Sequence, residues 1–228
     1  MTLMLRKQLL PFIVLLALLS ACGSPKNDKQ NTEDAKSTNE SEQTLVKKNI
    51  LIFGTSLTAG LGLDLEEAYP ALLQNKIDSL QLPYHVINAG LSGETTAGGK
   101  GRIDWLLKQQ IDVFVLELGA NDALRGISVK DATNNLQFII DQVKSKNPNV
   151  KLVMVGMQAP PNLGRTYTTE FKEMFPKLAT KNNMTLVPFL LDKVGGVPSL
   201  NQPDGIHPTA EGAKILADNV WVKLSGLL

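Results

Sequence analysis

Short apolar runs alternate, from residue 48 onward, with stretches whose apolar positions recur every three or four residues. The runs predict five strands, at residues 50–53, 84–87, 113–116, 152–155 and 185–187. The longer periodic stretches predict helices, around residues 69–80, 102–108, 129–143, 171–178 and 208–224. Strands this apolar, separated by helices, are typical of an α/β fold whose parallel sheet is covered on both faces.

Two of the predicted helices carry start signals. Ser128 stands three residues before Asp131, and this spacing resembles a capping box at the start of a helix. Pro208 follows His207 directly, and proline is favoured at the first helical position. We therefore expect the last helix to open at Pro208.

Polar or glycine-rich segments follow the first three predicted strands. Ser56 lies in Gly-Thr-Ser-Leu-Thr after the first strand, residues 88–99 hold four glycines after the second, and Gly119-Ala120-Asn121-Asp122 follows the third. The carboxyl ends of parallel strands share one edge of a sheet, where sites form in α/β proteins. We expect these segments to converge at that rim.

Residues 204–208, Asp-Gly-Ile-His-Pro, supply two of the three groups of a nucleophilic triad. His207 would be the general base for the hydroxyl of Ser56, and Asp204 would hold its imidazole in one tautomer. A helix-entry turn explains Asp204 equally well when it is taken alone. The other histidine, His85, lies inside a predicted strand, where a structural role is favoured.

Acyl transfer also needs hydrogen-bond donors aimed at the developing oxyanion. The candidates are the backbone N–H of Gly93, the side-chain amide of Asn121 and the backbone N–H of Ser56 itself. An ordinary turn glycine and an ordinary loop asparagine are the alternatives for the first two. The segments 124–126 and 160–164 are expected to form loops beside the site.

Four blocks in this order resemble the signature of the SGNH, or GDSL-type, hydrolases: Gly-x-Ser-Leu-Thr, Asn-Ala-Gly-Leu-Ser-Gly-Glu-Thr, Gly-Ala-Asn-Asp and Asp-Gly-Ile-His-Pro. The resemblance covers residues 48–224 and implies that the blocks contribute Ser56, Gly93, Asn121 and His207. Residues 116–126 and 175–179 resemble the branch of the bacterial multifunctional thioesterase/lysophospholipase and arylesterases. The resemblance implies a three-layer α/β/α fold, with a flavodoxin-like sheet of five parallel strands. It also implies hydrolysis of esters or thioesters through a serine acyl-enzyme, without metal or cofactor.

The first block departs from the family pattern at one position. The family usually has aspartate before the serine, where this chain has Thr55. That aspartate is not the acid of the triad, which would be Asp204, so the departure affects the local turn or the titration of the site. Thr58 also distinguishes the block from the Gly-x-Ser-x-Gly elbow of α/β-hydrolases.

The N-terminus has a pattern of its own. Arg6 and Lys7 precede an apolar run, Leu9–Leu19, which is shorter than the roughly 20 residues that span a bilayer. This arrangement indicates a secretory signal. Leu-Ser-Ala-Cys at residues 19–22 resembles the lipobox of bacterial lipoproteins, which implies a signal peptide at 1–21 and lipidation of Cys22. A plain signal peptide with an incidental cysteine is the alternative.

The next segment, 22–47, is predicted to be a flexible tether, because residues 23–44 contain Ala35 as their only apolar side chain. Residues 48–228 then form one domain, which we expect to be monomeric. The formal net charge of the whole chain is +1, and there is no basic stripe interleaved with aromatics, so nothing supports nucleic-acid binding. No His, Cys or Asp cluster has metal-ligand spacing.

These patterns predict an exported lipoprotein that hydrolyses small esters beside a membrane, to which the lipid on Cys22 would anchor it. Gly23 offers none of the aspartate-type cues that retain lipoproteins in the inner membrane, which favours an outer membrane where one exists. Lysophospholipids, aryl esters and short acyl esters are the favoured substrates, and thioesters are a further candidate class. Carbohydrate deacetylation, or binding of lipid or glycan without catalysis, are the alternatives.

Overall fold

The computed structural model describes residues 47–228. The predicted signal peptide at 1–21, Cys22 and the tether as far as residue 46 lie outside the described residues. Five strands form one parallel sheet in the order β2-β1-β3-β4-β5. They are β1 (Lys48–Gly54), β2 (Tyr84–Gly90), β3 (Val113–Glu117), β4 (Lys151–Val155) and β5 (Thr185–Val187).

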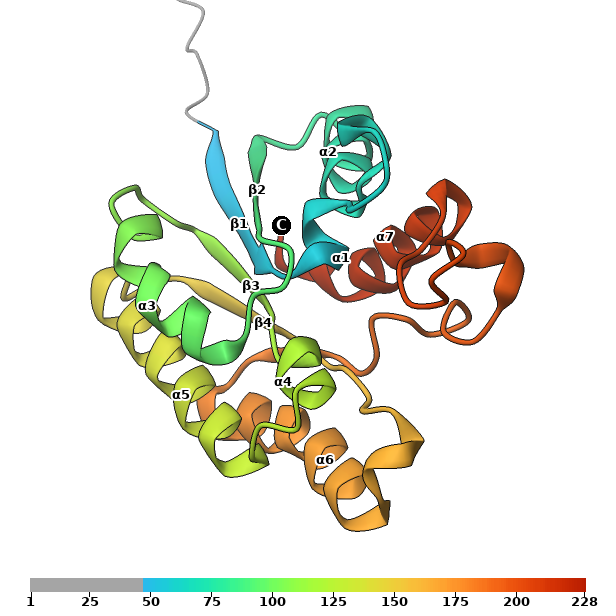
Figure 1. Ribbon diagram of the computed structural model, residues 1–228. Helices are drawn as coiled ribbons and strands as arrows, with labels where there is room; N and C mark the ends of the chain where they lie inside the picture. Colours follow the sequence, from blue (N-terminus) through green and yellow to red (C-terminus); the bar gives the residue numbers. More distant parts are fainter. Residues whose placement is uncertain (1–46) are drawn as a thin grey trace, which may run out of the picture. The chain divides into compact units, whose positions relative to one another are not determined.

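The α-helices connect and cover these strands. They are α1 (Ser56–Ala59), α2 (Tyr69–Ser79), α3 (Thr96–Leu106), α4 (Ala120–Leu124), α5 (Val129–Lys146), α6 (Arg165–Asn182) and α7 (Ala210–Leu224). Short 3₁₀ turns are η1 (Leu65–Glu67), η2 (Pro161–Leu163), η3 (Pro198–Leu200) and η4 (Ser225–Leu227). Helices α2 and α7 pack together on one face of the sheet, and α3, α5 and α6 cover the other (Figure 1). The expected three-layer fold with five parallel strands is confirmed.

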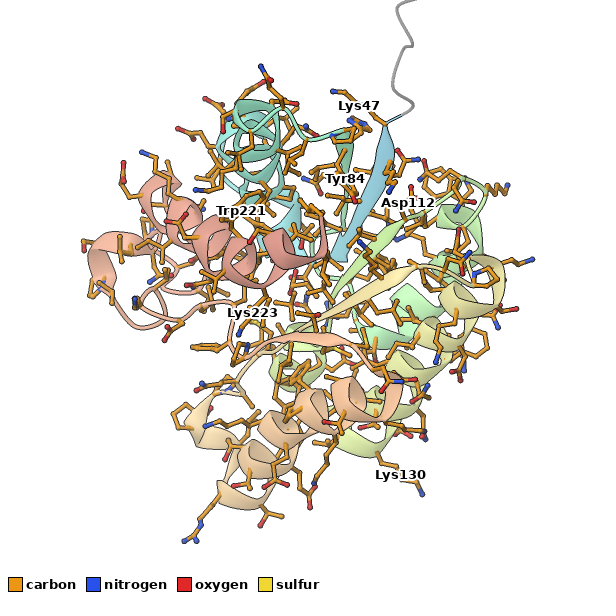
Figure 2. All side chains as sticks on the ribbon, turned by 180° about the vertical axis from the view of Figure 1, so that it is seen from behind. Lys47, Tyr84, Asp112, Lys130, Trp221 and Lys223 are labelled. Carbon is orange, nitrogen blue, oxygen red and sulfur yellow. The ribbon has the colours of Figure 1, made fainter. Side chains whose placement is uncertain are left out.

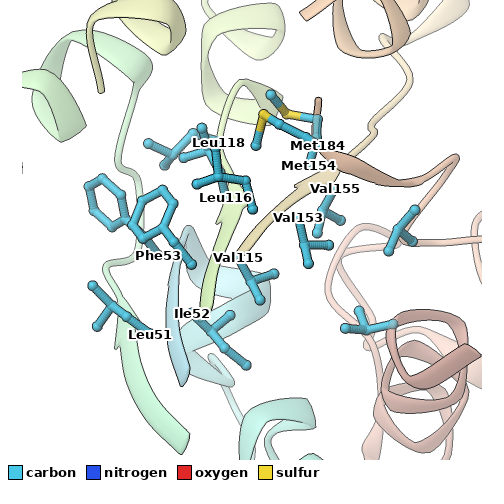
Figure 3. Close-up of a cluster of buried hydrophobic side chains, with 14 of the residues drawn as sticks. Leu51, Ile52, Phe53, Val115, Leu116, Leu118, Val153, Met154, Val155 and Met184 are labelled. Atoms are coloured by element: carbon cyan, nitrogen blue, oxygen red, sulfur yellow. The ribbon is translucent and has the colours of Figure 1, made fainter. Parts of the chain in front are cut away.

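The sheet register sorts the buried side chains into two rows. Phe53, Leu116 and Met154 are partners across three strands and lie on one face, while Ile52, Val115 and Val153 lie on the other (Figure 3). All six are fully buried. Residues that are partners in a parallel sheet point to the same face, so the apolar strands build both halves of the core.

Many charged side chains lie on the outer faces of the helices. Lys130 in α5 points away from the body of the protein (Figure 2), and Lys223 near the end of α7 is also exposed. The hydroxyl of Tyr84, on the edge strand β2, donates a hydrogen bond to the main-chain oxygen of Leu228 at 3.2 Å, which holds Leu228 beside that strand. Within residues 47–228, every helix is too short or too polar to cross a membrane.

Helix α5 begins as predicted. Ser128 is its N-cap and accepts a hydrogen bond from the backbone N–H of Asp131 at 3.1 Å. Helix α3, in contrast, starts at Thr96, well before the predicted residue 102. Gly99, which suggested a loop, lies inside α3, where an added Cβ would stand 2.5 Å from a methyl of Leu118. The glycine serves close packing of helix on sheet.

The predicted start of the last helix is wrong. Thr209 is the N-cap of α7, and its hydroxyl accepts a hydrogen bond from the N–H of Gly212 at 3.3 Å. Pro208 lies outside the helix and pairs with Asn201 in an isolated antiparallel bridge. The hydroxyl of a threonine satisfies a free N–H of the first turn, so it defines the boundary better than proline does.

Candidate active site

The turn that carries Ser56 lies between β1 and the single-turn helix α1. Thr55 is the N-cap of α1, and its hydroxyl accepts the N–H of Leu57 at 3.4 Å. Gly90 of β2 permits α1 to lie against that strand, because a Cβ there would stand 2.2 Å from the backbone nitrogen of Ala59. This packing holds Ser56 at the carboxyl edge of the sheet.

His207 and Asp204 come from the loop before α7. Oδ1 of Asp204 accepts the backbone N–H groups of Ile206 and His207, both at 3.0 Å. The intervening Gly205 has a φ of +74°, a left-handed conformation that glycine adopts without a steric penalty. Oδ2 of Asp204 lies 2.6 Å from Nδ1 of His207, and Nε2 of His207 lies 2.8 Å from Oγ of Ser56.

The carboxylate of Asp204 determines which ring nitrogen of His207 carries the hydrogen. Hydrogen bonds from the His207 side chain and then from the backbone of Ile206 and His207 lower the pKa of Asp204 to about 2. Asp204 is therefore ionised at neutral pH and accepts a hydrogen bond from the Nδ1–H of His207. Nε2 is then left with its lone pair toward Ser56, so the serine hydroxyl donates to it. This geometry places Nε2 of His207 to take the serine proton.

Two further groups from the sequence prediction lie beside Ser56. Asn121 is in the first turn of α4, and its Nδ2 donates one hydrogen to the carbonyl of Glu94 at 3.1 Å. Its second amide hydrogen remains for another acceptor. Gly93 lies in a turn with a φ of +79°. Nη1 of Arg125 donates to the Gly93 carbonyl at 2.8 Å and holds that turn in place.

Ser56, Gly93, Asn121 and His207 line one cavity of about 510 Å³. The structure thus brings together the four residues that the motifs selected, with Asp204 bound behind the imidazole. His85, the other histidine, is exposed on β2 and does not line this cavity. Most of the remaining lining is apolar and includes Leu57, Leu61, Leu124, Met157, Pro160 and Ile206.

The mouth of the cavity is apolar as well. Leu61, Leu124 and Ile206 are 46%, 54% and 49% exposed, so large aliphatic side chains surround the entrance. Leu124 ends helix α4, and residues 161–163 form η2, so both segments expected as loops are partly helical. Pro160 and Pro161 nevertheless line the cavity. An apolar entrance with a few converging polar groups is typical of a small-molecule site.

Sequence reasoning missed three side chains that brace this site. Nε2 of Gln202 donates to the carbonyls of Leu61 at 2.7 Å and Pro208 at 2.9 Å, which connects the histidine loop to the segment after α1. Arg125 holds the Gly93 turn, as described above. Glu117 is fully buried beneath the serine turn. A charged residue within the apolar run 113–118 was a signal that could have pointed to Glu117.

No three His, Cys, Asp or Glu side chains between residues 47 and 228 are grouped closely enough to hold a metal ion. The chain of hydrogen bonds from Asp204 through His207 to Ser56 is, in its order and atoms, that of a serine hydrolase. The parallel sheet presents it at the carboxyl edge of its strands, as α/β enzymes present their sites.

The chain belongs to the GDSL-like lipase/acylhydrolase family, which it matches over residues 52–215. It is 37% identical over 187 residues to Esterase TesA of Pseudomonas aeruginosa, which covers 82% of this chain and 92% of the relative. It is 38% identical over 180 residues to Thioesterase 1/protease 1/lysophospholipase L1 of Escherichia coli K12, covering 78% of this chain and 84% of the relative.

A solved structure agrees with this assignment. The crystal structure of TesA superimposes with a TM-score of 0.76 and 37% identity, covering 79% of this chain and all of that one. The protein is therefore an ester hydrolase of the SGNH type. The resemblance of the four sequence blocks to this family is confirmed.

Proposed function

We propose that this protein hydrolyses carboxylic esters with an apolar acyl or aryl group, through an acyl-enzyme formed on Ser56. One observation carries the proposal: Oγ of Ser56 lies 2.8 Å from Nε2 of His207, whose Nδ1 lies 2.6 Å from Asp204. A serine hydroxyl becomes an effective nucleophile when such a base takes its proton.

In the first half of the reaction, Oγ of Ser56 attacks the ester carbonyl carbon while its proton passes to Nε2 of His207. The second amide hydrogen of Asn121 and the N–H groups of Gly93 and Ser56 receive the oxyanion. The carbon–oxygen bond to the alcohol then breaks, and the imidazolium gives its proton to the departing oxygen. Asp204 stabilises the transient positive charge on His207.

In the second half, water attacks the acyl-enzyme while His207 takes one of its protons. The bond to Ser56 breaks, the proton returns to Oγ, and the carboxylic acid leaves. Each oxyanion donor is expected to contribute about 10²- to 10³-fold in rate.

The cavity favours an apolar substrate. Its lining and entrance present aliphatic side chains, among them Leu61, Leu124 and Ile206, which suit an acyl chain or an aryl ring better than a sugar. The relatives named esterase and thioesterase/lysophospholipase support lysophospholipids, aryl esters and acyl esters as the substrate class. Carbohydrate deacetylation has no specific support in this lining.

The test uses a fluorophosphonate probe and a series of p-nitrophenyl esters from acetate to palmitate, with lysophosphatidylcholine and acetylated xylan as further substrates. The wild-type protein should be labelled and Ser56→Ala should not, while rates should exceed background for apolar esters. Labelling that persists in Ser56→Ala would contradict the mechanism. Turnover of acetylated xylan alone would contradict the substrate class.

We also propose that the protein is an exported, monomeric lipoprotein that meets its substrate at a membrane through a lipid on Cys22. The lipobox-like residues 19–22 support this proposal. Radiolabelled palmitate should enter the wild-type chain expressed in a bacterial host and should not enter Cys22→Ala. Equal incorporation in both, or none in either, would contradict it.

A further inference from the structure

The carboxyl group of Glu117 lies buried directly beneath the turn that carries Ser56. Glu117 ends β3 and is the register partner of Gly54 in β1, one residue before that turn. Its Oε2 accepts the backbone N–H of Thr55 and the hydroxyl of Thr58, both at 2.8 Å. The hydroxyl of Thr55 also lies 3.1 Å from each carboxyl oxygen. Three donors on both sides of Ser56 therefore converge on this one carboxyl.

The network extends from the serine turn to helix α2. The hydroxyl of Tyr69 lies 2.8 Å from Oγ1 of Thr58. Burial, and then the nearby charge of Glu117, raise the pKa of Tyr69 well above its usual range, so this phenol is neutral. Since Thr58 donates to Glu117, Tyr69 donates to Thr58. All of these hydroxyl groups are buried, and each has its partner.

The backbone makes room for this carboxyl. A Cβ on Gly54 would stand 2.0 Å from Oγ1 of Thr58 and 2.5 Å from Oε2 of Glu117. Only glycine at position 54 is compatible with both contacts. The glycine of the Gly-Thr-Ser-Leu-Thr block therefore serves the buried network rather than a special backbone angle.

Glu117 does not stabilise the fold through an ion pair. Across residues 47–228, no lysine, arginine or histidine forms an ion pair with it. Burying a carboxyl without a cation has an unfavourable desolvation free energy, and an apolar side chain would fill the same space without this penalty. What Glu117 offers instead is a rigid acceptor for the segment that flanks the nucleophile.

We propose that Glu117 is a positioning residue for the reaction: its carboxyl fixes residues 55–58 and so holds the Ser56 hydroxyl at hydrogen-bond distance from His207. This inference rests on the proposed role of Ser56 as the nucleophile. It also explains Thr55, whose hydroxyl donates to Glu117, whereas the aspartate usual at this position would place a second carboxyl there. Small displacements of a reacting group lower the rate steeply, by up to about 100-fold for 1 Å.

The test compares matched variants at two positions. Thr55→Val removes the hydroxyl at similar volume, and Thr55→Ser keeps it. Glu117→Gln keeps the shape and one acceptor oxygen, and Glu173→Gln makes the same change at an exposed residue of α6. kcat and KM are measured with a p-nitrophenyl ester, and kcat is expressed per active site titrated with a phosphonate, so that unfolded protein does not count.

Thr55→Val and Glu117→Gln should lower kcat roughly 10- to 100-fold with KM changed little, because the nucleophile is displaced while the cavity remains. Thr55→Ser and Glu173→Gln should stay close to the wild type. If Thr55→Val and Thr55→Ser had equal kcat, or if Glu117→Gln kept the wild-type kcat per site, the positioning role would be overturned. A wild-type protein that the phosphonate does not label would overturn the proposed function first, and this inference with it.

Discussion

The burial of Glu117 makes the free energy of unfolding depend on pH in a way that one substitution can isolate. Desolvation raises the pKa of Glu117 from 4.5 to about 7, although hydrogen bonds from Thr55 and Thr58 oppose the shift. One pKa unit corresponds to about 1.4 kcal/mol, so the shift is equivalent to about 3 kcal/mol. The folded protein binds this proton more tightly than the unfolded chain. The protonation of Glu117 therefore contributes its full stabilisation of the folded protein below pH 4.5, and this stabilisation is lost as the pH rises through 7.

Glu117→Gln removes this titration while keeping the shape of the side chain. Urea unfolding of the wild type and the variant, followed by circular dichroism at several pH values from 4.5 to 8, gives the free energy of unfolding of each. Relative to Glu117→Gln, the wild type should lose about 3 kcal/mol across this range. For a domain of this size the loss corresponds to roughly 6 to 12 °C in the melting temperature.

The comparison variant is Glu173→Gln, which changes a carboxyl that is exposed on α6. Its stability should run parallel to that of the wild type throughout the range. Refutation would come from a difference between wild type and Glu117→Gln that is independent of pH, or that grows in favour of the wild type as the pH rises. Either result would mean that Glu117 is already ionised at low pH in the folded state.

Three other substitutions test the site and the packing around it. Asp204→Asn should lower kcat by about 10⁴-fold, because the amide no longer fixes the imidazole tautomer, and steady-state kinetics with a retained fold would show it. Asn121→Ala should lower kcat about 10²- to 10³-fold with little change in KM, and equal turnover would exclude an oxyanion role. Gly99→Ala should destabilise the fold by about 1–3 kcal/mol, since its Cβ would stand 2.5 Å from Leu118; an unchanged melting temperature would contradict this packing.

Much of this architecture could be predicted from local patterns alone. Each of the five strands contains a run of apolar residues, and Ser56, Gly93 and Asn121 follow three of the strands. Their convergence therefore follows from the shared carboxyl edge of a parallel sheet. Asp204 and His207 are three positions apart, so a short sequence motif is sufficient to predict their pairing.

Features that depend on the packed fold were missed. The early start of α3 was not predicted, because Gly99 by itself indicates a loop. Only the packed structure shows that this glycine allows α3 to lie close to the sheet. The role of Glu117 depends on a register that places it beside Gly54, which no local pattern encodes. The start of α7 was misjudged because two adjacent residues, Pro208 and Thr209, both carry helix-start signals.

The hydrogen bond between His207 and Ser56 also has a kinetic meaning. It joins residues 151 positions apart, whereas the bond between Asp204 and His207 closes a loop of three. Closing a long loop costs more chain entropy than closing a short one, and non-local contacts form late in folding. Asp204 and His207 can thus form their hydrogen bond in a partly folded chain. Ser56 can bond to His207 only when the first strand and the last helix have both packed into the fold. Esterase activity should therefore recover only when the complete α/β fold has formed. During refolding, its recovery should lag behind the recovery of the helical circular dichroism signal.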